Sequence, residues 1–516
     1  MKRLKSIKEF DEIKARLIQD KTPQKACITI SSGTCGQARG SLKVIEAFEQ
    51  KIRSNGLKEP VTMRVTGCHG FCEVEPTVLI YPEGILYQKV KPEDAEQIIT
   101  ETLINHRIID HLLFSDPVSG RKFTHEDQLP FYQKQKRLVM GNNRFVDPTN
   151  IEDYLAVGGY SAFRKVLSSM TSEQVISEMK KSGLRGRGGG GFPTGFKWEF
   201  CKKSKGAVKY IICNADEGDP GAYMDRSLLE GNPHSVLEGM LIGAFAIGAS
   251  QGYIYARNEY PLAVKNVSWA IDQAKQYGLL GEDILGSGFN FDINIVRGAG
   301  AFVCGEETAL IASVEGKLGE PRQRPPYPVQ KGLWGKPTNI NNVETWANVP
   351  LVLDKGADWF LGIGTEKSKG TKIFSLVGKI NNTGLVEVPM GIKLREIIED
   401  IGGGIPKGKK FKAVQTGGPS GGCMPAKLLD LPVDYEKLTE VGSMMGSGGM
   451  VVMDEDTCMV DVAKYFLNFL KDESCGKCFT CREGILRMLE IVTDITEGKG
   501  TMADLQLLED LAQAVK

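Results

Sequence analysis

The sequence predicts an α/β protein built from several domains, and three observations lead to this expectation. The chain has 516 residues, which at roughly 150 residues per domain corresponds to three or four domains. Hydrophobic residues make up 41% of the chain, enough to build real cores. Short apolar runs alternate with segments of helical periodicity.

The formal net charge is zero, which argues against a general nucleic-acid-binding protein.

The expected elements fall into four groups along the chain. The first group has the pattern helix, strand, helix and two strands, and a charged candidate linker, Arg121 to Arg144, follows it. The second alternates strands and helices, the third contains short strands and one helix, and the fourth is helical by periodicity. These groups cover residues 1 to about 125, about 145 to 350, about 355 to 440 and about 445 to 516.

Neither a secretory signal nor a membrane span is predicted. The first 20 residues alternate charged and apolar positions like an amphipathic helix, without the uncharged core of a signal peptide. The longest apolar stretch, Gly239 to Ser250, is shorter than the about 20 residues that a bilayer requires, and we expect it to be a buried helix. We therefore expect a cytoplasmic protein, in whose reducing compartment clustered cysteines bind metals more often than they form disulfides.

The densest cysteine group is a C-x2-C-x2-C run formed by Cys475, Cys478 and Cys481. Three thiolates from one loop are typical of a [4Fe–4S] cluster that a distant fourth cysteine completes. A zinc site is the alternative, but it requires a fourth Cys or His close by. No cysteine follows Cys481, and the last residues are helical in pattern without a stop signal. We therefore expect a truncated chain that ends before the fourth ligand.

A second cysteine group joins Cys35, in SSGTCG, with Cys68 and Cys72, in TGCHGFCEVEP. Both loops follow runs of β character, and two strand-to-loop turns that carry thiols indicate a possible shared [2Fe–2S] site. Ser31 stands where a first ligand is expected. The alternative is therefore a domain that kept its fold and lost its cluster. The isolated cysteines are expected to be small buried apolar residues, and they are Cys201, Cys213, Cys304, Cys423 and Cys458.

Glycines concentrate in GLRGRGGGGFPTG, between Gly183 and Gly195, just before Lys197. Such a run lets the backbone approach a phosphate, and its N–H groups and a following helix N-terminus favour an anion. A flexible linker is the alternative. Two further segments, CNADEGDPG and GAGAFVCGEET, place polar residues after predicted strands, where open α/β sheets bind ligands. In a fourth segment, LWGKPTNINNVET, adjacent amides suit hydrogen bonds to a sugar, a ribityl chain or a heterocycle. A capped turn is the alternative for each of these segments alone. Together the four segments predict one nucleotide or flavin site.

These motifs and the later ESCGKCFTCREG closely resemble, in this order, the NADH-binding flavoprotein subunit of respiratory complex I and its soluble relatives. The relatives are NAD-linked subunits of hydrogenases, formate dehydrogenases and electron-bifurcating complexes. The resemblance covers residues 130 to 516. Asp219 and Phe302 stand where complex I subunits carry Glu and Tyr, and DEGDPGAYMDRS and GGPSGGCMP are more similar to the hydrogenase and bifurcating branch.

The resemblance implies four domains. The first is similar to the thioredoxin-like [2Fe–2S] domain, which is a separate subunit in complex I and is fused here, as in hydrogenase-type relatives. A Rossmann-like FMN- and NADH-binding domain, a ubiquitin-like β-grasp (soluble-ligand-binding) domain and a helical bundle with the [4Fe–4S] loop follow. Their implied ranges are 1–125, 126–350, 351–442 and 443–516.

The resemblance also implies a set of residues that bind FMN and NADH. Glu307 would favour NADH over a nucleotide with a phosphorylated ribose. The implied residues are Gly186, Arg187, Gly188 and Gly189 beside the flavin, Lys197 at the FMN phosphate, Phe192, Phe200 and Tyr327 against the nucleotide, Asn214 and Asp216 at the isoalloxazine and ribityl groups, Glu217 and Asp219 beside the nicotinamide, Phe302, Gly305, Glu306 and Glu307 along the pocket, and Asn341, Asn342 and Thr345 around the ribityl phosphate.

The implied activity is transfer of a hydride from NAD(H) to FMN and then of single electrons to iron–sulfur clusters, or the reverse. No side chain has to act as a nucleophile or as an obligatory acid–base catalyst. The implied partners are other iron–sulfur or catalytic subunits of a hydrogenase, formate dehydrogenase, bifurcating transhydrogenase or acyl-CoA reductase complex. A flavoprotein subunit of complex I and a non-catalytic scaffold that binds a nucleotide or cluster are the alternatives.

Overall fold

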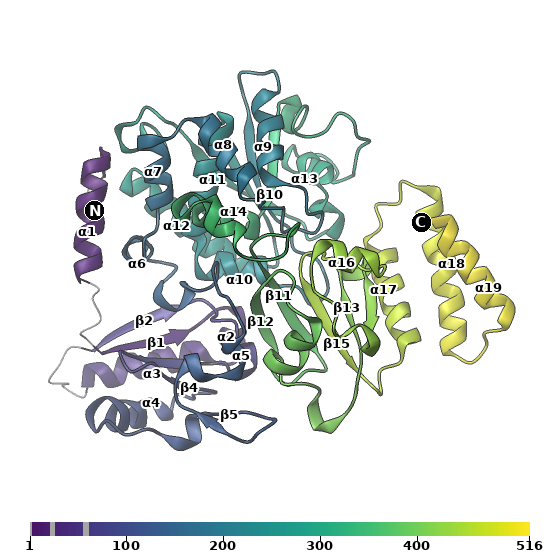
Figure 1. Cartoon of the computed structure of the whole chain (residues 1–516), viewed down its shortest axis with the longest axis horizontal. Coiled ribbons are helices and arrows are strands. Elements are labelled where there is room, and N and C mark those ends of the chain that lie inside the picture. Colours follow the sequence, from purple (N-terminus) through teal and green to yellow (C-terminus); the bar gives the residue numbers. More distant parts are fainter. Residues whose placement is uncertain (1–2, 21–25, 55–60, 516) are drawn as a thin grey trace.

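The computed structural model describes residues 3–20, 26–54 and 61–515. Three sheets of four or five strands, their covering helices and a C-terminal group of helices make up this part of the chain (Figure 1). The prediction of a mixed α/β protein with several sheets and a helical C-terminus is confirmed. Among the described helices, none is long and apolar enough to cross a membrane.

The N-terminal sheet has the strand order β2-β1-β3-β4, with β1 and β2 parallel and the other pairs antiparallel. The sequence predicted two strands after the helix. The structure has three, because the apolar residues 78–87 fold back as a hairpin. Helix α1 (Ile7–Asp20) precedes this sheet in the chain but does not pack on it; it lies near α6 and α7 (Figure 1). The elements are β1 (Cys27–Ser31), α2 (Thr34–Ala38), α3 (Ser41–Ser54), β2 (Thr62–Thr66), β3 (Val78–Tyr81), β4 (Ile85–Tyr87) and α4 (Asp94–Gln97).

The central sheet is wholly parallel, in the order β10-β7-β8-β9. Parallel strands need covering elements on both faces, and the chain supplies helices between the strands. These elements are α6 (Ile151–Ala156), α7 (Ser161–Ser169), α8 (Ser172–Lys181), α9 (Thr194–Lys203), β7 (Tyr210–Ala215), α10 (Met224–Gly231), α11 (Pro233–Ile247), β8 (Gln251–Arg257), α12 (Pro261–Tyr277), β9 (Asp292–Gly298), α13 (Glu307–Val314), β10 (Thr338–Asn342), α14 (Val343–Lys355) and α15 (Ala357–Leu361).

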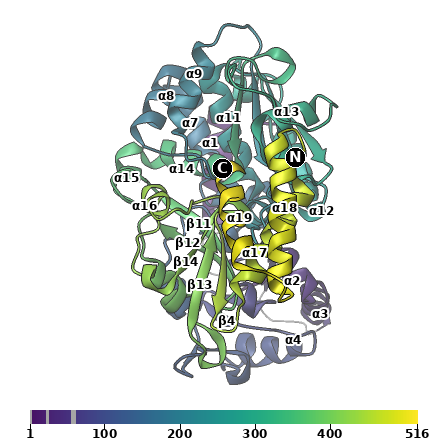
Figure 2. The ribbon, with the colours of Figure 1, turned by 90° about the vertical axis from the view of Figure 1, so that its right-hand side faces the viewer.

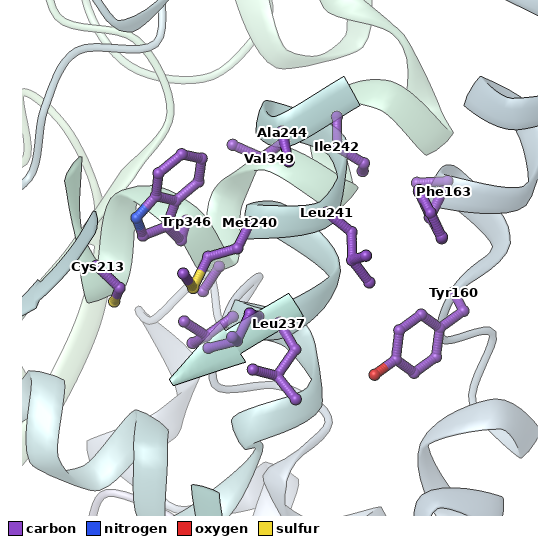
Figure 3. Close-up of a cluster of buried hydrophobic side chains, with 14 of the residues drawn as sticks. Tyr160, Phe163, Cys213, Leu237, Met240, Leu241, Ile242, Ala244, Trp346 and Val349 are labelled. Carbon is purple, nitrogen blue, oxygen red and sulfur yellow. The ribbon is translucent and has the colours of Figure 1, made fainter. Parts of the chain in front are cut away.

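Helix α11 forms the centre of the largest core. The apolar stretch predicted to be a buried helix, Gly239 to Ser250, lies in α11 as far as Ile247, and the helix ends there because Gly248 adopts a positive φ of 78°. Leu237, Met240 and Leu241 on α11 face Trp346 on α14 and Tyr160 near α7 (Figure 3). The helices approach so closely that a Cβ on Gly239 would lie 2.0 Å from the Trp346 carbonyl oxygen.

The third sheet has the order β12-β11-β15-β13-β14 and contains the strands predicted at residues 372–377 and 385–388. Three C-terminal helices follow it and lie at one side of the molecule (Figures 1 and 2). The elements are β11 (Thr371–Gly378), β12 (Gly384–Pro389), β13 (Phe411–Thr416), β14 (Gly422–Pro425), α16 (Tyr435–Glu440), β15 (Gly449–Asp454), α17 (Met459–Glu473), α18 (Phe479–Thr496) and α19 (Met502–Val515).

The charged segment predicted as a linker is instead packed between the first and third sheets. It begins near the short hairpin of β5 (Phe114–Ser115) and β6 (Lys122–Phe123) and contains α5 (Pro130–Gln133). Phe131 is fully buried and stacks on Phe71 with ring centroids 4.0 Å apart. The buried Glu387 carboxylate accepts the backbone N–H groups of residues 139 and 140. The few apolar residues among the charges therefore determine how this segment packs.

Candidate functional site

A cavity of about 1130 Å³ lies at the carboxyl-terminal edge of the parallel sheet. Asn214, next to the last residue of β7, lies opposite Asn342, the last residue of β10, because the two strands are parallel neighbours in this register. The structure brings most of the predicted cofactor residues together here. Those that line the cavity are Gly186, Gly188, Phe192, Lys197, Phe200, Asn214, Gly305, Glu306, Glu307, Tyr327, Asn341 and Asn342.

The glycine-rich segment forms a closed loop before α9. The Gly186 N–H donates to the Phe192 carbonyl at 2.9 Å, and the Thr194 N–H donates to the Leu184 carbonyl at 2.9 Å. A Cβ on Gly188 would lie 3.0 Å from the Asn342 Cβ, whereas a Cβ on Gly190 would meet no atom within 4 Å. The loop thus packs against β10 on one side and presents bare backbone to the cavity on the other, as a phosphate or a planar ring requires.

Lys197, in the first half of α9, brings a positive charge to the cavity wall. Its Nζ forms an ion pair with Glu307 and donates to the Ile340 carbonyl at 2.5 Å. Glu306 caps α13 by accepting the Thr308 N–H at 2.8 Å. The site therefore places a cation and two carboxylates along one wall, which suits an anionic group next to hydroxyls.

The asparagines of β10 are held by hydrogen bonds from the surrounding core. The Asn341 Oδ1 accepts the Trp198 indole N–H at 3.0 Å. The Asn342 Oδ1 accepts the Glu344 N–H at 2.9 Å and so caps α14. These bonds fix two side chains rigidly at the floor of the cavity, which favours precise recognition of a bound heterocycle or sugar.

Aromatic rings stand at the mouth of the cavity. Phe192, Phe200 and Tyr327 are each about half exposed, and the two phenylalanine rings have centroids 6.5 Å apart. Exposed rings at a cavity mouth can cover a planar base. The sequence reasoning missed the basic residues of this mouth, Lys203, Lys205 and Arg324. The two lysines could have been predicted, because Lys203 ends the helix that follows the glycine loop and Lys205 lies just after it.

The remaining predicted residues do not line the cavity. Arg187 is fully buried, and its guanidinium donates to the carbonyls of Thr371 at 3.1 Å and Lys369 at 2.6 Å. It therefore attaches the glycine loop to β11. Phe302 packs against Phe469 of α17. The other residues of this set are Gly189, Asp216, Glu217, Asp219 and Thr345.

Buried carboxyl groups gather behind the cavity floor. Burial raises the pKa of Glu217 to about 7, although its oxygens accept the N–H groups of Asp225 at 3.1 Å and Arg226 at 3.2 Å. Burial also raises the pKa of Asp216 to about 7, with Arg257 3.5 Å away opposing the shift. The pKa of Asp225 is raised well above its ordinary value, again mainly by burial. The Asn342 amide donates to Asp225, so the acidic group contacts a residue of the cavity wall.

Cys475 and Cys478 lie in the loop between α17 and α18, and Cys481 lies in the first turn of α18. Cys478 is exposed, and Cys475 and Cys481 are half-buried. The loop contacts the segment that leads to Arg324 of the cavity, because the Lys477 Nζ donates to the Pro321 carbonyl at 2.6 Å. Glu473, the last residue of α17, makes a second contact, in which its carboxylate accepts the Phe302 N–H at 2.8 Å. The loop thus lies beside the segment that leads to Gly305 of the cavity.

The N-terminal thiols converge at the end of the first sheet. The Cys68 and Cys72 sulfurs are 3.8 Å apart, and a hydrogen bond with Cys72, together with burial, raises the pKa of Cys35. The Ser31 hydroxyl is engaged with Glu75 and with Thr77, 2.7 Å away. Within the described ranges, no three or more His, Cys, Asp or Glu side chains are arranged to hold a single metal ion. A cluster differs from such a site because bridging sulfides separate its thiolates.

The prediction that the five isolated cysteines are buried is confirmed for three of them and wrong for two. Cys201, Cys213 and Cys304 are buried, as predicted. Cys423 and Cys458 are exposed, and the prediction that they are buried is wrong. Cys423 lies on β14, the last strand in the order of the third sheet, and Cys458 directly precedes α17.

Comparisons with known proteins match three parts of the chain to family models. Residues 179–351 match the Nuo51 FMN-binding domain. Residues 373–423 match the SLBB domain. Residues 461–516 match the NADH-ubiquinone oxidoreductase-F iron-sulfur binding region. The first match contains most of the cavity residues, and the last contains the C-x2-C-x2-C loop.

Curated relatives and a solved structure extend these matches. The chain is 61% identical to the NADP-reducing hydrogenase subunit HndC of Solidesulfovibrio fructosivorans over 384 residues, 74% of this chain and 78% of that protein. It is 42% identical to an NADH-quinone oxidoreductase subunit of Escherichia coli K12 over 71% of this chain and 82% of that protein. An NAD+-reducing [NiFe]-hydrogenase structure, in its air-oxidized state, matches with a TM-score of 0.64 and 28% identity, over 98% of this chain and 82% of that chain.

Proposed function

Because this chain belongs to the family that contains these NADH-quinone oxidoreductase and hydrogenase subunits, we propose that it carries electrons between NADH and iron–sulfur clusters by way of FMN. It does so as one component of a multisubunit oxidoreductase. The observation that carries the proposal is the cavity at the sheet edge, where the glycine loop, Lys197 and the β10 asparagines meet. The higher identity to the hydrogenase relative favours a hydrogenase-type complex.

The residues present fit FMN and NADH. The bare backbone at Gly190 and the charge on Lys197 suit a phosphate. The cavity volume of about 1130 Å³ exceeds that of a typical single-ligand pocket, so a flavin and a dinucleotide can share it. When bound, FMN supplies the conversion of a two-electron hydride transfer into single-electron steps.

The chain's own residues position and shield the reacting groups. Phe192 and Phe200 cover the nucleotide at the mouth, and Glu307 accepts ribose hydroxyls while it holds Lys197 toward the phosphate. Asn214 is fixed by its hydrogen bond to the Gly305 carbonyl at 2.8 Å and borders the flavin. Holding two rings in one fixed arrangement is the main contribution a protein makes to hydride transfer. Of the buried carboxyls, Asp225 contacts the cavity floor through its hydrogen bond from Asn342.

The cysteine sites and the finer fold assignment belong to the same proposal. Cys475, Cys478 and Cys481 would hold a [4Fe–4S] cluster, and the contacts of Glu473 and Lys477 with the segments that lead to the cavity residues support electron transfer between the two sites. Cys35, Cys68 and Cys72 would hold a [2Fe–2S] cluster with one ligand other than cysteine. We assign residues 1–125 as thioredoxin-like, 126–350 as Rossmann-like, 351–442 as β-grasp and 443–516 as a helical bundle. Two elements depart from these bounds, because α1 packs on α7 of the second part and β15 (Gly449–Asp454) lies inside the sheet of the third. Electron bifurcation stays a prediction.

The visible spectrum of the purified protein tests the flavin function. We expect an oxidised-flavin band that NADH bleaches under anaerobic conditions. Lys197→Glu should lose most of the flavin, because it replaces the cation at the phosphate with an anion. Lys202→Glu is the matched control, since Lys202 lies on the same helix but does not line the cavity. Full flavin retention in Lys197→Glu, or equal loss in both variants, would contradict the assigned role.

A further inference from the structure

The N-terminal thiols are enclosed partly by helix α10, which belongs to the central sheet. The Tyr223 hydroxyl, just before α10, lies 3.4 Å from the Cys72 sulfur. The Arg226 Nη2, in the first turn, lies 3.8 Å from the Cys35 sulfur. Figure 1 shows α10 and α2 adjacent at this boundary. The thiol site is therefore built by two sheets of the molecule, and one contributes a cation.

Arg226 is held in this position from several directions. Its Nε lies 3.6 Å from the Glu230 carboxylate, and the guanidinium faces the rings of Tyr223 and Tyr260 at 5.3 and 5.6 Å. The arginine side chain is only 19% exposed, and its Nε has no hydrogen-bond partner. A cation caged in this way keeps its charge near the sulfurs and is weakly screened by water.

Glu230 connects this cation to the start of α2, which carries Cys35. Its Oε2 accepts the Thr34 N–H at 2.8 Å, and its Oε1 accepts the Thr34 hydroxyl. Thr34 directly precedes Cys35 on this helix. The same carboxylate therefore fixes both the helix start that carries the thiol and the guanidinium that contacts it.

The first turn of α10 also reaches the cavity. Asp225, next to Arg226, accepts a hydrogen bond from Asn342, which lines the cavity floor. One helical turn thus contacts the flavin site on one side and the thiols on the other. This juxtaposition places the cation between the proposed electron donor and the proposed acceptor.

We propose that Arg226, assisted by Tyr223, is a positioning residue that raises the reduction potential of the iron–sulfur centre held by Cys35, Cys68 and Cys72. The inference rests on the [2Fe–2S] site of the proposed function. Reduction adds one electron and no proton to the centre, so a nearby cation and a hydroxyl donor to sulfur stabilise the reduced state. The helix therefore makes electron transfer from the cavity side to this centre more favourable.

An EPR-monitored redox titration of the full chain tests this inference. Arg226→Gln should lower the equilibrium constant for reducing the N-terminal centre about tenfold, which is about 59 mV for one electron. Arg226→Lys should restore most of the potential, because it returns the charge. Tyr223→Phe should lower the potential less, since it removes only a hydroxyl. Cys68→Ser identifies the signal by abolishing or changing it.

Arg64→Gln is the matched control. Arg64 lies on β2, the strand that precedes Cys68 and Cys72, and its side chain is 21% exposed, close to the 19% of Arg226. It pairs with Asp153 at 3.1 Å, so its substitution breaks an ion pair without contacting a thiol. An unchanged potential in Arg226→Gln, an equal shift in Arg64→Gln or no rescue by lysine would overturn the inference. If no signal responds to Cys68→Ser, the inference also fails. The bleaching of the flavin by NADH is then the separate readout that decides the rest of the proposed function.

Discussion

Lys372 is the cation of an ion pair that water does not reach. Its Nζ contacts the Glu344 carboxylate, and the two side chains are 0% and 1% exposed. The Nζ also donates to the Ile373 carbonyl at 2.8 Å, and the Glu344 Oε1 accepts the Ile373 N–H at 2.9 Å. The pair joins β11 of the third sheet to α14 of the central one. Lys372→Met removes the cation while it keeps most of the side chain's volume.

The expected cost is large, because the carboxylate stays behind. Removing one partner of a buried ion pair costs about 3–5 kcal/mol of unfolding free energy. Asp225 and Glu217 lie in the same acidic group, and Lys372 lowers the pKa of both, so its loss leaves this group with less positive charge nearby. At about 2–4 °C per kcal/mol for a unit of 150–250 residues, the midpoint of thermal unfolding should fall by roughly 6–20 °C.

Thermal unfolding followed by circular dichroism measures this change. The double variant Glu344→Gln/Lys372→Met should recover at least half of the loss, because a neutral amide oxygen can still accept the Ile373 N–H without carrying a buried charge. Lys379→Met, at the exposed residue after β11, is the control and should stay within about 0.5 kcal/mol of the unsubstituted chain. A fall below about 2 °C in Lys372→Met, or a double variant less stable than the single one, would refute the reasoning.

Three further outcomes are expected. Glu217 has a raised pKa of about 7 against its usual 4.5, so the folded chain binds its proton more tightly and its contribution to stability is lost as pH rises from about 4.5 to 7. The linked loss of unfolding free energy is about 3 kcal/mol. Glu217→Gln should therefore reduce the fall in unfolding temperature between pH 5 and 7. An unchanged dependence of the unfolding temperature on pH would disprove the raised pKa of Glu217. Cys478→Ser should remove the iron of the C-terminal cluster, whereas Cys458→Ser should keep it, and equal iron contents by metal analysis would reject the ligand set. Gly239→Ala should destabilise the chain by about 1–3 kcal/mol or more, because the new Cβ would lie 2.0 Å from a carbonyl oxygen; a melting temperature equal to that of the unsubstituted chain would show that α11 and α14 can separate freely.

Local sequence patterns predicted much of what carries the cavity. The glycine loop and the strand near Asn214 each have a recognisable pattern, and Asn341 and Asn342 were predicted as ligands from their adjacent amides. The strand β10 that holds these two asparagines was not predicted; its parallel pairing with β7 brings them to the same edge as Asn214. The buried helix α11 was also predicted, because an apolar stretch too short to span a bilayer has to be buried in the core of a folded domain. The thiol convergence followed from loops at the ends of neighbouring strands.

Side-chain direction could not be predicted in the same way. Arg187 sits between cavity glycines in sequence, yet its guanidinium turns to the carbonyls of another sheet. Phe302 is three residues from Gly305 but packs on α17. The segment between Arg121 and Arg144 has the charge of a linker, and its contacts with Phe71 and with Glu387 of the third sheet give it a fixed position. These outcomes depend on tertiary partners that are distant in the sequence, which local patterns do not encode.

The side chain of Asn342 has a consequence for substitution. Its oxygen accepts from the first turn of α14, and its nitrogen donates to the carboxyl of Asp225. Aspartate has the same shape and is an equally good helix cap, but it would bring a second carboxyl group against the buried carboxyl of Asp225. Burial already raises the pKa of Asp225, and the added negative charge would raise it further, so the pair would have to hold a proton between them. Asparagine donates this hydrogen bond without a shared proton, and the exchange of two residues of equal size at position 342 would therefore make the floor of the cavity depend on pH.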